Sequence, residues 1–134
     1  MTRGIRNNNP GNIRHDSSKW RGEIQGTDKS FKTFSLMEWG VRAMFHLLNN
    51  YKKLHQCDTL RKLINRWAPP TENQTDRYVA FVAHYAKISP DQTIDTTNPD
   101  VMIAVVRSMI KMENGVYIDE QDLKKGWELF LKYK

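Results

Sequence analysis

Glu113 is the residue of this sequence best suited to acid catalysis. It follows a largely apolar run and stands directly before Asn114 and Gly115, where a helix would end. A carboxyl group in an apolar surrounding can stay protonated near neutral pH, and such a group can donate its proton to a glycosidic oxygen. The alternative is a glutamate that is exposed at a helix end or engaged in a structural salt bridge.

A cluster of amide side chains lies near the N-terminus. Residues 3–14 include four asparagines, two glycines and one proline, a composition that favours neither a helix nor a strand and is typical of a shaped loop. Neutral amides both donate and accept hydrogen bonds, which suits uncharged ligands such as N-acetyl sugars. We therefore expect Asn9 and Asn12, together with Arg14, to contact a substrate. The alternative is a structural turn whose amides cap their own backbone.

Two other glutamates compete with Glu113 for the catalytic role. Glu38 lies three residues after Ser35, so it can complete a capping box at a helix start or belong to a site. Glu72 and its neighbour Asn73 lie in a polar loop after two prolines, where they can cap the next helix or line a sugar groove. The sequence alone leaves these alternatives open.

Aromatic and amide side chains complete the set of candidate substrate contacts. Trp20 and Tyr78 can stack on sugar rings, although the helical spacing around Tyr78 also fits a core residue. Asn114 is a further candidate because it follows Glu113 directly. The four histidines are scattered without metal-ligand spacing, so we expect neither a metal nor another cofactor. The remaining tryptophans are assigned to the core: Trp39, Trp67 and Trp127.

Hydrophobic periodicity predicts a mainly helical scaffold for these residues. Turn residues between short apolar pieces predict a small β-hairpin of residues 21–24 with residues 30–34. The helix with the most apolar residues should be buried, with Asn98 as its N-cap and Gly115 as its left-handed C-terminal residue. We therefore expect one mainly α (α+β) domain over residues 1–134. Its predicted helices are 35–54, 59–67, 75–86, 99–114 and 119–132.

Composition limits where such a domain can act. The chain has 134 residues, a formal net charge of +6 and a single cysteine, and its mean hydropathy is −0.70. No apolar run approaches the ~20 residues of a membrane helix, and the N-terminus lacks the apolar core of a signal peptide. The basic balance favours a polyanion such as an anionic cell envelope, whereas no recognisable motif points to nucleic acid.

Several motifs resemble those of a family of small bacteriophage and prophage proteins, which are described as virion structural proteins or lysozyme-like proteins. The most specific matches are Asn-Pro-Gly-Asn-Ile-Arg at residues 9–14 and Trp-Ala-Pro-Pro-Thr-Glu-Asn at residues 67–73. Trp-Arg-Gly at residues 20–22 and Gly-Val-Arg-Ala at residues 40–43 lie between them. Because the N-terminus lacks the core of a signal peptide, we expect a protein made in the bacterial cytoplasm. If it acts at the cell wall or periplasm, a holin, a virion or a secretion machine must deliver it.

A second resemblance concerns the end of the predicted buried helix. Ile-Lys-Met-Glu-Asn-Gly at residues 110–115 is similar to the helix-ending Glu-Ser-Gly of lysozyme-like lytic transglycosylases and glucosaminidases, although Asn114 replaces the serine. In those enzymes the glutamate is catalytic, and a motif of the Asn-Leu-Phe-Gly-Ile-Lys type follows it. Here the similar motif precedes it. We therefore expect a circularly permuted lysozyme-like domain, in which residues 9–14 and Glu113 face one cleft and the chain ends lie on the same side.

These observations predict a protein that cleaves the glycan strands of peptidoglycan with Glu113 as general acid. Because only one acid is convincing, a transglycosylase-like route fits better than a route through a second protein carboxylate. In that route the substrate's own groups close an anhydro ring. Two other classes stay open: a non-catalytic virion structural or wall-binding protein, and a basic nucleic-acid-binding module.

Overall fold

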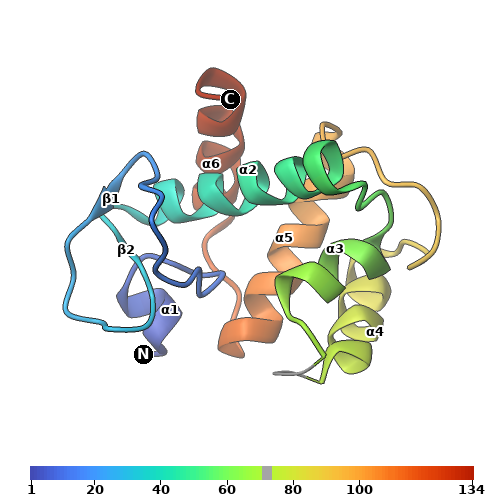
Figure 1. Ribbon diagram of the computed structural model, residues 1–134, viewed down its shortest axis with the longest axis horizontal. Coiled ribbons are helices and arrows are strands. Elements are labelled where there is room, and N and C mark those ends of the chain that lie inside the picture. The colour runs from blue at the N-terminus through green and yellow to red at the C-terminus, as the bar shows by residue number, and fades with distance from the viewer. Residues whose placement is uncertain (71–73) are drawn as a thin grey trace.

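Figure 1 shows the computed structural model, which describes residues 1–70 and 74–134. Across these residues the fold is mainly helical with one small antiparallel hairpin, as predicted. The elements in chain order are α1 (Arg3–Arg6), β1 (Glu23–Ile24), β2 (Thr33–Phe34), α2 (Met37–His55), α3 (Leu60–Trp67), α4 (Thr75–Ala86), α5 (Pro99–Asn114) and α6 (Glu120–Lys132). In the hairpin, Glu23 pairs with Phe34 and Ile24 with Thr33.

Helix α5 forms the centre of the domain. Asn98 caps its start by accepting a hydrogen bond from the backbone N–H of Asp100 at 3.0 Å. The helix ends at Gly115, whose φ of 75° lies in the left-handed region that favours glycine. Both α4 and α6 pack against it, and its apolar residues after Pro99 are fully or partly buried. The fully buried ones are Met102, Val105, Val106, Met109 and Ile110. The predicted caps and the predicted central position of this helix are therefore confirmed.

Helices α2 and α6 form a second packed pair, which crosses the upper part of the molecule in Figure 1. The Phe45 ring of α2 contacts Trp127 and Phe130 of α6, with ring centroids 5.0 and 6.2 Å apart. These three rings are buried. The assignment of Trp127 to the core is thus confirmed.

The start of α2 differs from the prediction. Its N-cap is Leu36, and no side chain makes a capping hydrogen bond there. The expected capping box of Ser35 and Glu38 is therefore wrong. Ser35 instead donates its backbone N–H to the carbonyl of Gly22 at 2.9 Å, which ties the chain before α2 to the segment before β1.

The N-terminal segment also differs, because it is not entirely a loop. Arg3–Arg6 form one helical turn, which begins where the Thr2 hydroxyl accepts the backbone N–H of Ile5. The asparagines follow this turn, and Asn8 and Asn12 both have a φ of 51°. Asparagine tolerates that left-handed conformation better than most residues, so the predicted turn lies directly after α1.

The chain ends lie at opposite edges of the view in Figure 1, with the N-terminus at the lower left and the C-terminus at the top. The expectation that both ends lie on the same side of the domain is therefore wrong. The reason is that different elements hold them. Thr2 donates a hydrogen bond to Asn114 at the end of α5 at 2.7 Å, whereas α6 crosses α2 and carries the C-terminus to the top of the view.

Asp28 fixes α1 to the loop that precedes β2. Its carboxylate accepts two hydrogen bonds from the Arg3 guanidinium at 2.8 and 3.0 Å and one from Asn7 at 3.0 Å. The backbone N–H groups of Ser30 and Phe31 add bonds of 2.9 and 3.0 Å. The Arg3 guanidinium above all, and then the Ser30 N–H, lower the pKa of Asp28 far below its ordinary value.

This network predicts an acid-sensitive contribution to folding. Because the pKa of Asp28 is lower in the folded chain than in the unfolded chain, its stabilisation is present above the unfolded value of about 4 and is lost as the pH falls below it. The free energy of unfolding of the wild type should therefore fall more steeply between pH 5 and pH 2.5 than that of Asp28→Asn. Urea unfolding at a series of pH values measures both slopes, and parallel curves would contradict the role of Asp28.

Candidate active site

Glu113 lies at the C-terminal end of α5 and is half-buried. Its Oε1 accepts a hydrogen bond from Asn12 Nδ2 at 3.0 Å, and its Oε2 accepts one from the Tyr78 hydroxyl at 2.9 Å. Asn12 belongs to the N-terminal loop and Tyr78 to α4, so the carboxylate joins three segments that are distant in sequence. The structure thus places the candidate acid beside the Asn-rich loop.

Tyr78 is both a core residue and a neighbour of the candidate acid, the two alternatives that the sequence left open. Its side chain packs in the hydrophobic core with 5% of its surface exposed, while its hydroxyl reaches Glu113. Burial, and then the neighbouring carboxylate, raise the pKa of Tyr78 well above its ordinary value. The phenol therefore stays neutral at physiological pH and acts as a hydrogen-bond donor to Glu113.

Two adjoining hollows open beside this carboxylate. The Glu113 hollow has a volume of about 140 Å³, and its wall includes Glu113, Phe31 and Ala68. The Trp20 hollow has a volume of about 330 Å³, and its wall includes Trp20 and Tyr51. The residues common to both walls are Gly11, Asn12, Arg14 and Trp67. Together the hollows form a groove that runs from the candidate acid along the N-terminal loop.

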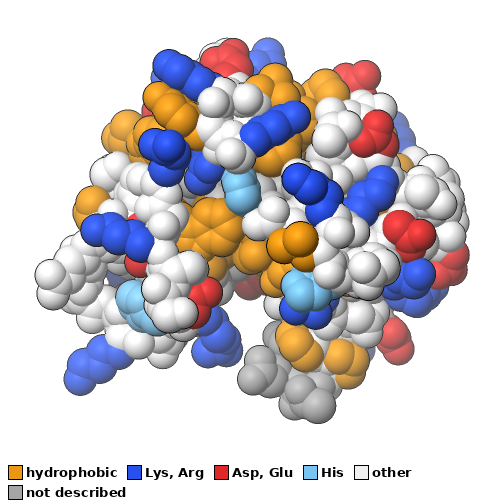
Figure 2. Space-filling model, turned by 45° about the horizontal axis from the view of Figure 1, so that its top comes forward, with side chains coloured by type: hydrophobic (Ala, Val, Ile, Leu, Met, Phe, Trp, Pro, Cys, Tyr) orange, Lys and Arg blue, Asp and Glu red, His pale blue; other side chains and the backbone are white. Residues whose placement is uncertain are grey.

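The groove lies between the part of the molecule that carries the hairpin and the part that carries α3. Figure 2 shows this face hollowed between the two parts, with hydrophobic side chains at the inner end of the hollow. An aromatic wall beside polar loop groups suits a sugar, because rings cover the apolar faces of sugars while amides and charges meet their hydroxyl and acyl groups.

Trp67 packs against the core, as assigned, but it is also a wall residue of this groove, a position that the sequence did not predict. It is partly exposed and lines both hollows. Its ring centroid lies 6.4 Å from that of Tyr51. Trp67 ends α3 directly before Ala68 and Pro69. Its position at the helix end could have predicted partial exposure, because the last residue of a helix is less enclosed than the residues in its middle.

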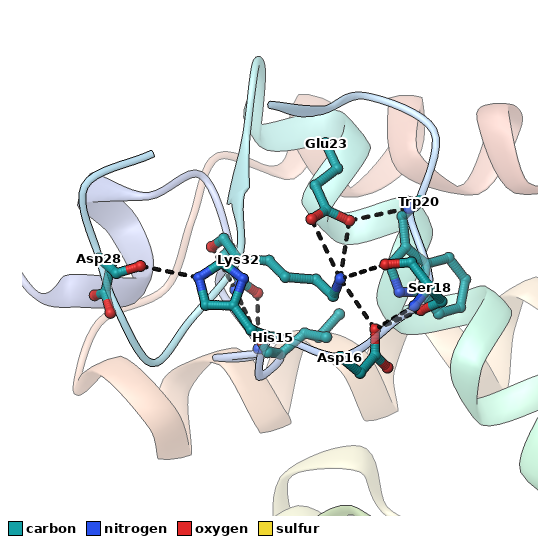
Figure 3. A network of polar contacts seen from close by, with 9 residues as sticks. His15, Asp16, Ser18, Trp20, Glu23, Asp28 and Lys32 are labelled. Carbon is teal, nitrogen blue, oxygen red and sulfur yellow. Dashed lines mark hydrogen bonds and ion pairs between the residues drawn. The ribbon is translucent and has the colours of Figure 1, made fainter. Parts of the chain in front are cut away.

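A buried lysine holds the wall that carries Trp20 (Figure 3). Lys32 is 1% exposed, and its Nζ donates to the Ser18 carbonyl at 2.8 Å and to Glu23 at 3.0 Å. The same Nζ pairs with Asp16 at 3.1 Å, and Glu23 also accepts the backbone N–H of Trp20 at 3.0 Å. A buried ammonium group needs such partners. Lys32, which the sequence did not single out, thus fixes the segment around Trp20.

Asn9 does not face the groove, which corrects its expected contact with substrate. It is fully buried. Its Nδ2 donates to the carbonyls of Ile13 and Lys32 at 3.0 and 2.8 Å, and its Oδ1 accepts the Ile13 N–H at 2.9 Å. Its amide is therefore used inside the protein, and the structural alternative holds for this residue.

Asn114 is corrected in the same way. It is 6% exposed, and its Nδ2 donates to the carbonyls of Pro10 and Ile110 at 2.8 and 2.9 Å. Its Oδ1 accepts the hydrogen bond from Thr2. Asn114 therefore fastens the N-terminal segment to α5 and has no amide group left for a ligand.

The remaining candidates divide into three groups. Arg14 lines both hollows and Trp20 lines the larger one, as their predicted roles require, although no ligand contact tests those roles. Glu38 lies in the first turn of α2 and is not part of either wall. Glu72 and Asn73 lie outside the described residues.

The described parts of the chain contain no group of three or more His, Cys, Asp or Glu side chains arranged for a metal ion. Within those same parts, every helix is too short or too polar to cross a lipid bilayer.

Comparison with known proteins gives one informative match. No protein-family model matches the chain. Protein P5 of Pseudoalteromonas phage PM2 is 37% identical to it over 131 residues, which covers 94% of this chain and 80% of that protein.

The buried amide of Asn9 gives a test of how the groove wall is built. In Asn9→Ala, the Lys32 carbonyl and the Ile13 N–H lose the partner that Asn9 gives them in the interior, while the Ile13 carbonyl keeps the Lys32 N–H, so unfolding should become easier by about 2–4 kcal/mol. Asn65→Ala is the matched control, because Asn65 makes a single exposed bond to the Arg61 carbonyl and its loss should cost about 0.5 kcal/mol or less. Urea unfolding measures both. Equal stability of the two variants would show that the Asn9 bonds contribute little.

Proposed function

The chain belongs to the family of Protein P5 of Pseudoalteromonas phage PM2, and from this phage relationship and the geometry at Glu113 we propose that it cleaves the glycan strands of peptidoglycan through a lysozyme-like site. The observation that carries the proposal is a carboxyl at the end of a buried helix, held by Asn12 and Tyr78 and open to a groove. The reversed order of the two motifs and the contact of Asn12 with Glu113 support a circular permutation of that fold, whereas the separated chain ends count against it.

Glu113 would act as the general acid. A carboxylate has about four lone-pair positions, and Asn12 and Tyr78 occupy one on each oxygen. One of the remaining positions can carry the acidic proton that faces the glycosidic oxygen of a bound strand. Protonated Glu113 donates its proton to that oxygen as the bond to the anomeric carbon breaks. Asn12 and Tyr78 then stabilise the carboxylate that forms, which favours proton transfer.

A transglycosylase-like route suits the charges around the groove. Among the described residues, Glu113 is the only acidic wall residue of its own hollow. Asp16 lines the neighbouring hollow, but Lys32 already pairs with it. The second step therefore falls to the substrate: its own primary hydroxyl attacks the anomeric carbon, Glu113 takes the hydroxyl proton, and an anhydro ring closes.

The proposed site of action is the bacterial cell wall. The partner is the glycan strand itself, and a virion or a secretion machine would deliver the protein. The formal charge of +6 would favour approach to an anionic envelope.

Glu113→Gln tests the acid directly. The amide cannot donate a proton as an acid does, so release of soluble fragments from purified peptidoglycan should fall by roughly 10²–10⁴-fold. Glu38→Gln is the control, because Glu38 lies outside the groove walls. Thermal melting should show all three proteins folded.

Several outcomes would contradict the assignment. Wild-type turnover in Glu113→Gln would eliminate Glu113 as the acid. Loss of turnover in Glu38→Gln would move the site to α2. A folded wild type that releases no fragments would identify a non-catalytic virion or wall-binding protein.

A further inference from the structure

Two guanidinium groups lie over the ring of Phe31 at the edge of the groove. The Cζ atoms of Arg3 and Arg14 are 4.5 and 5.2 Å from the ring centroid. The charge of Arg3 is neutralised there, because its Nε and Nη2 both donate hydrogen bonds to the Asp28 carboxylate. The charge of Arg14 is not: among the described residues Arg14 forms neither an ion pair nor a side-chain hydrogen bond, although it lines both hollows.

The position of Arg14 is nevertheless well defined. Its backbone forms a bridge with Phe31, and the bonds on either side of it, from Lys32 N–H to the Ile13 carbonyl and from His15 N–H to the Ser30 carbonyl, are 2.9 and 3.1 Å long. Stacking on Phe31 then limits the directions of the side chain. Arg14 is thus an oriented and exposed cation at the junction of the two hollows.

Among the described residues, the acidic side chains of the groove do not neutralise this cation. Glu113 accepts its hydrogen bonds from the neutral groups of Asn12 and Tyr78. Asp16 pairs with the buried Lys32. The five N–H donors of Arg14 are therefore available, and their fork matches the two oxygens of a carboxylate.

From this arrangement we propose that Arg14 binds a carboxylate carried by the substrate and so makes the groove selective for muramyl glycan over chitin. The inference rests on the proposed function and adds a specificity determinant to it. Both polymers carry N-acetyl groups, but only the muramyl sugar bears a lactyl ether, whose acid group is free or extended by an acidic peptide. A neutral chitin chain offers Arg14 no such partner.

The test compares two tetrasaccharides of equal length, one of alternating N-acetylglucosamine and N-acetylmuramic acid and one of N-acetylglucosamine alone. Binding is measured by calorimetry in the Glu113→Gln background, so that cleavage does not interfere. Arg14→Gln should weaken binding of the muramyl ligand about tenfold and leave the chitin ligand within about twofold. The affinity of Arg14→Lys for the muramyl ligand should lie between those of Arg14 and Arg14→Gln, because lysine keeps the positive charge but cannot donate two parallel hydrogen bonds to a carboxylate. The muramyl preference should also shrink at high salt.

Arg61→Gln is the matched control, since Arg61 is an exposed arginine of α3 that pairs with Asp91 away from the groove. It should change neither affinity. Equal binding of the two ligands before mutation, or an equal loss for both in Arg14→Gln, overturns the assignment of Arg14 and leaves the proposed function standing. Failure to bind either ligand with Arg14 intact overturns both.

Discussion

Three hydrogen bonds fasten the N-terminal loop to the end of α5, and the geometry of the candidate site depends on them. Thr2 donates to Asn114, Asn114 donates to the Pro10 carbonyl, and Asn12 donates to Glu113. Asn114 is the sequence neighbour of Glu113, so its buried amide also fixes the direction in which that carboxylate leaves the helix. These bonds help to fix the position of the Asn-rich loop relative to the acid.

The loop divides its amides between two tasks. Asn9 uses its whole amide inside the protein and holds the loop against β2. Asn12, with a left-handed backbone, lines the groove and directs its Nδ2 to Glu113, while its Oδ1 is buried. A buried amide is stable only when its groups are paired, so the first residue makes the position of the second possible. Lys32 does the same for the opposite wall, where it pairs with Asp16 and Glu23.

Local signals predicted the scaffold well. Asn98, Pro99 and Gly115 marked both ends of α5, and apolar spacing located α2, α3, α4 and α6, because caps and periodicity act within a few residues. The proximity of Asn12 and Glu113, 101 residues apart, followed from a resemblance between motifs. Local rules failed at the start of α2, where Leu36 is the N-cap and the Ser35 side chain makes no capping hydrogen bond.

Local rules could not predict which asparagine of the loop is buried and which one lines the groove. Asn9 and Asn12 are the same residue type in one turn-rich segment, and only the packing of that segment against β2 decides which amide is buried. Trp67 poses the same problem, since an aromatic residue at helical spacing fits a core or a groove wall equally well. Lys32 was missed because a buried charge is recognisable only through partners that the fold brings to it.

The central claim is that Glu113, held by Asn12 and Tyr78, cleaves glycan strands without a second protein carboxylate. Mass spectrometry of purified peptidoglycan after incubation with the folded protein tests it most directly, because the new chain ends record the chemistry. If Glu113 acts in this way, the soluble fragments end in anhydro sugars. Fragments with ordinary reducing ends would contradict the route, and peptidoglycan that stays intact would contradict the claim itself.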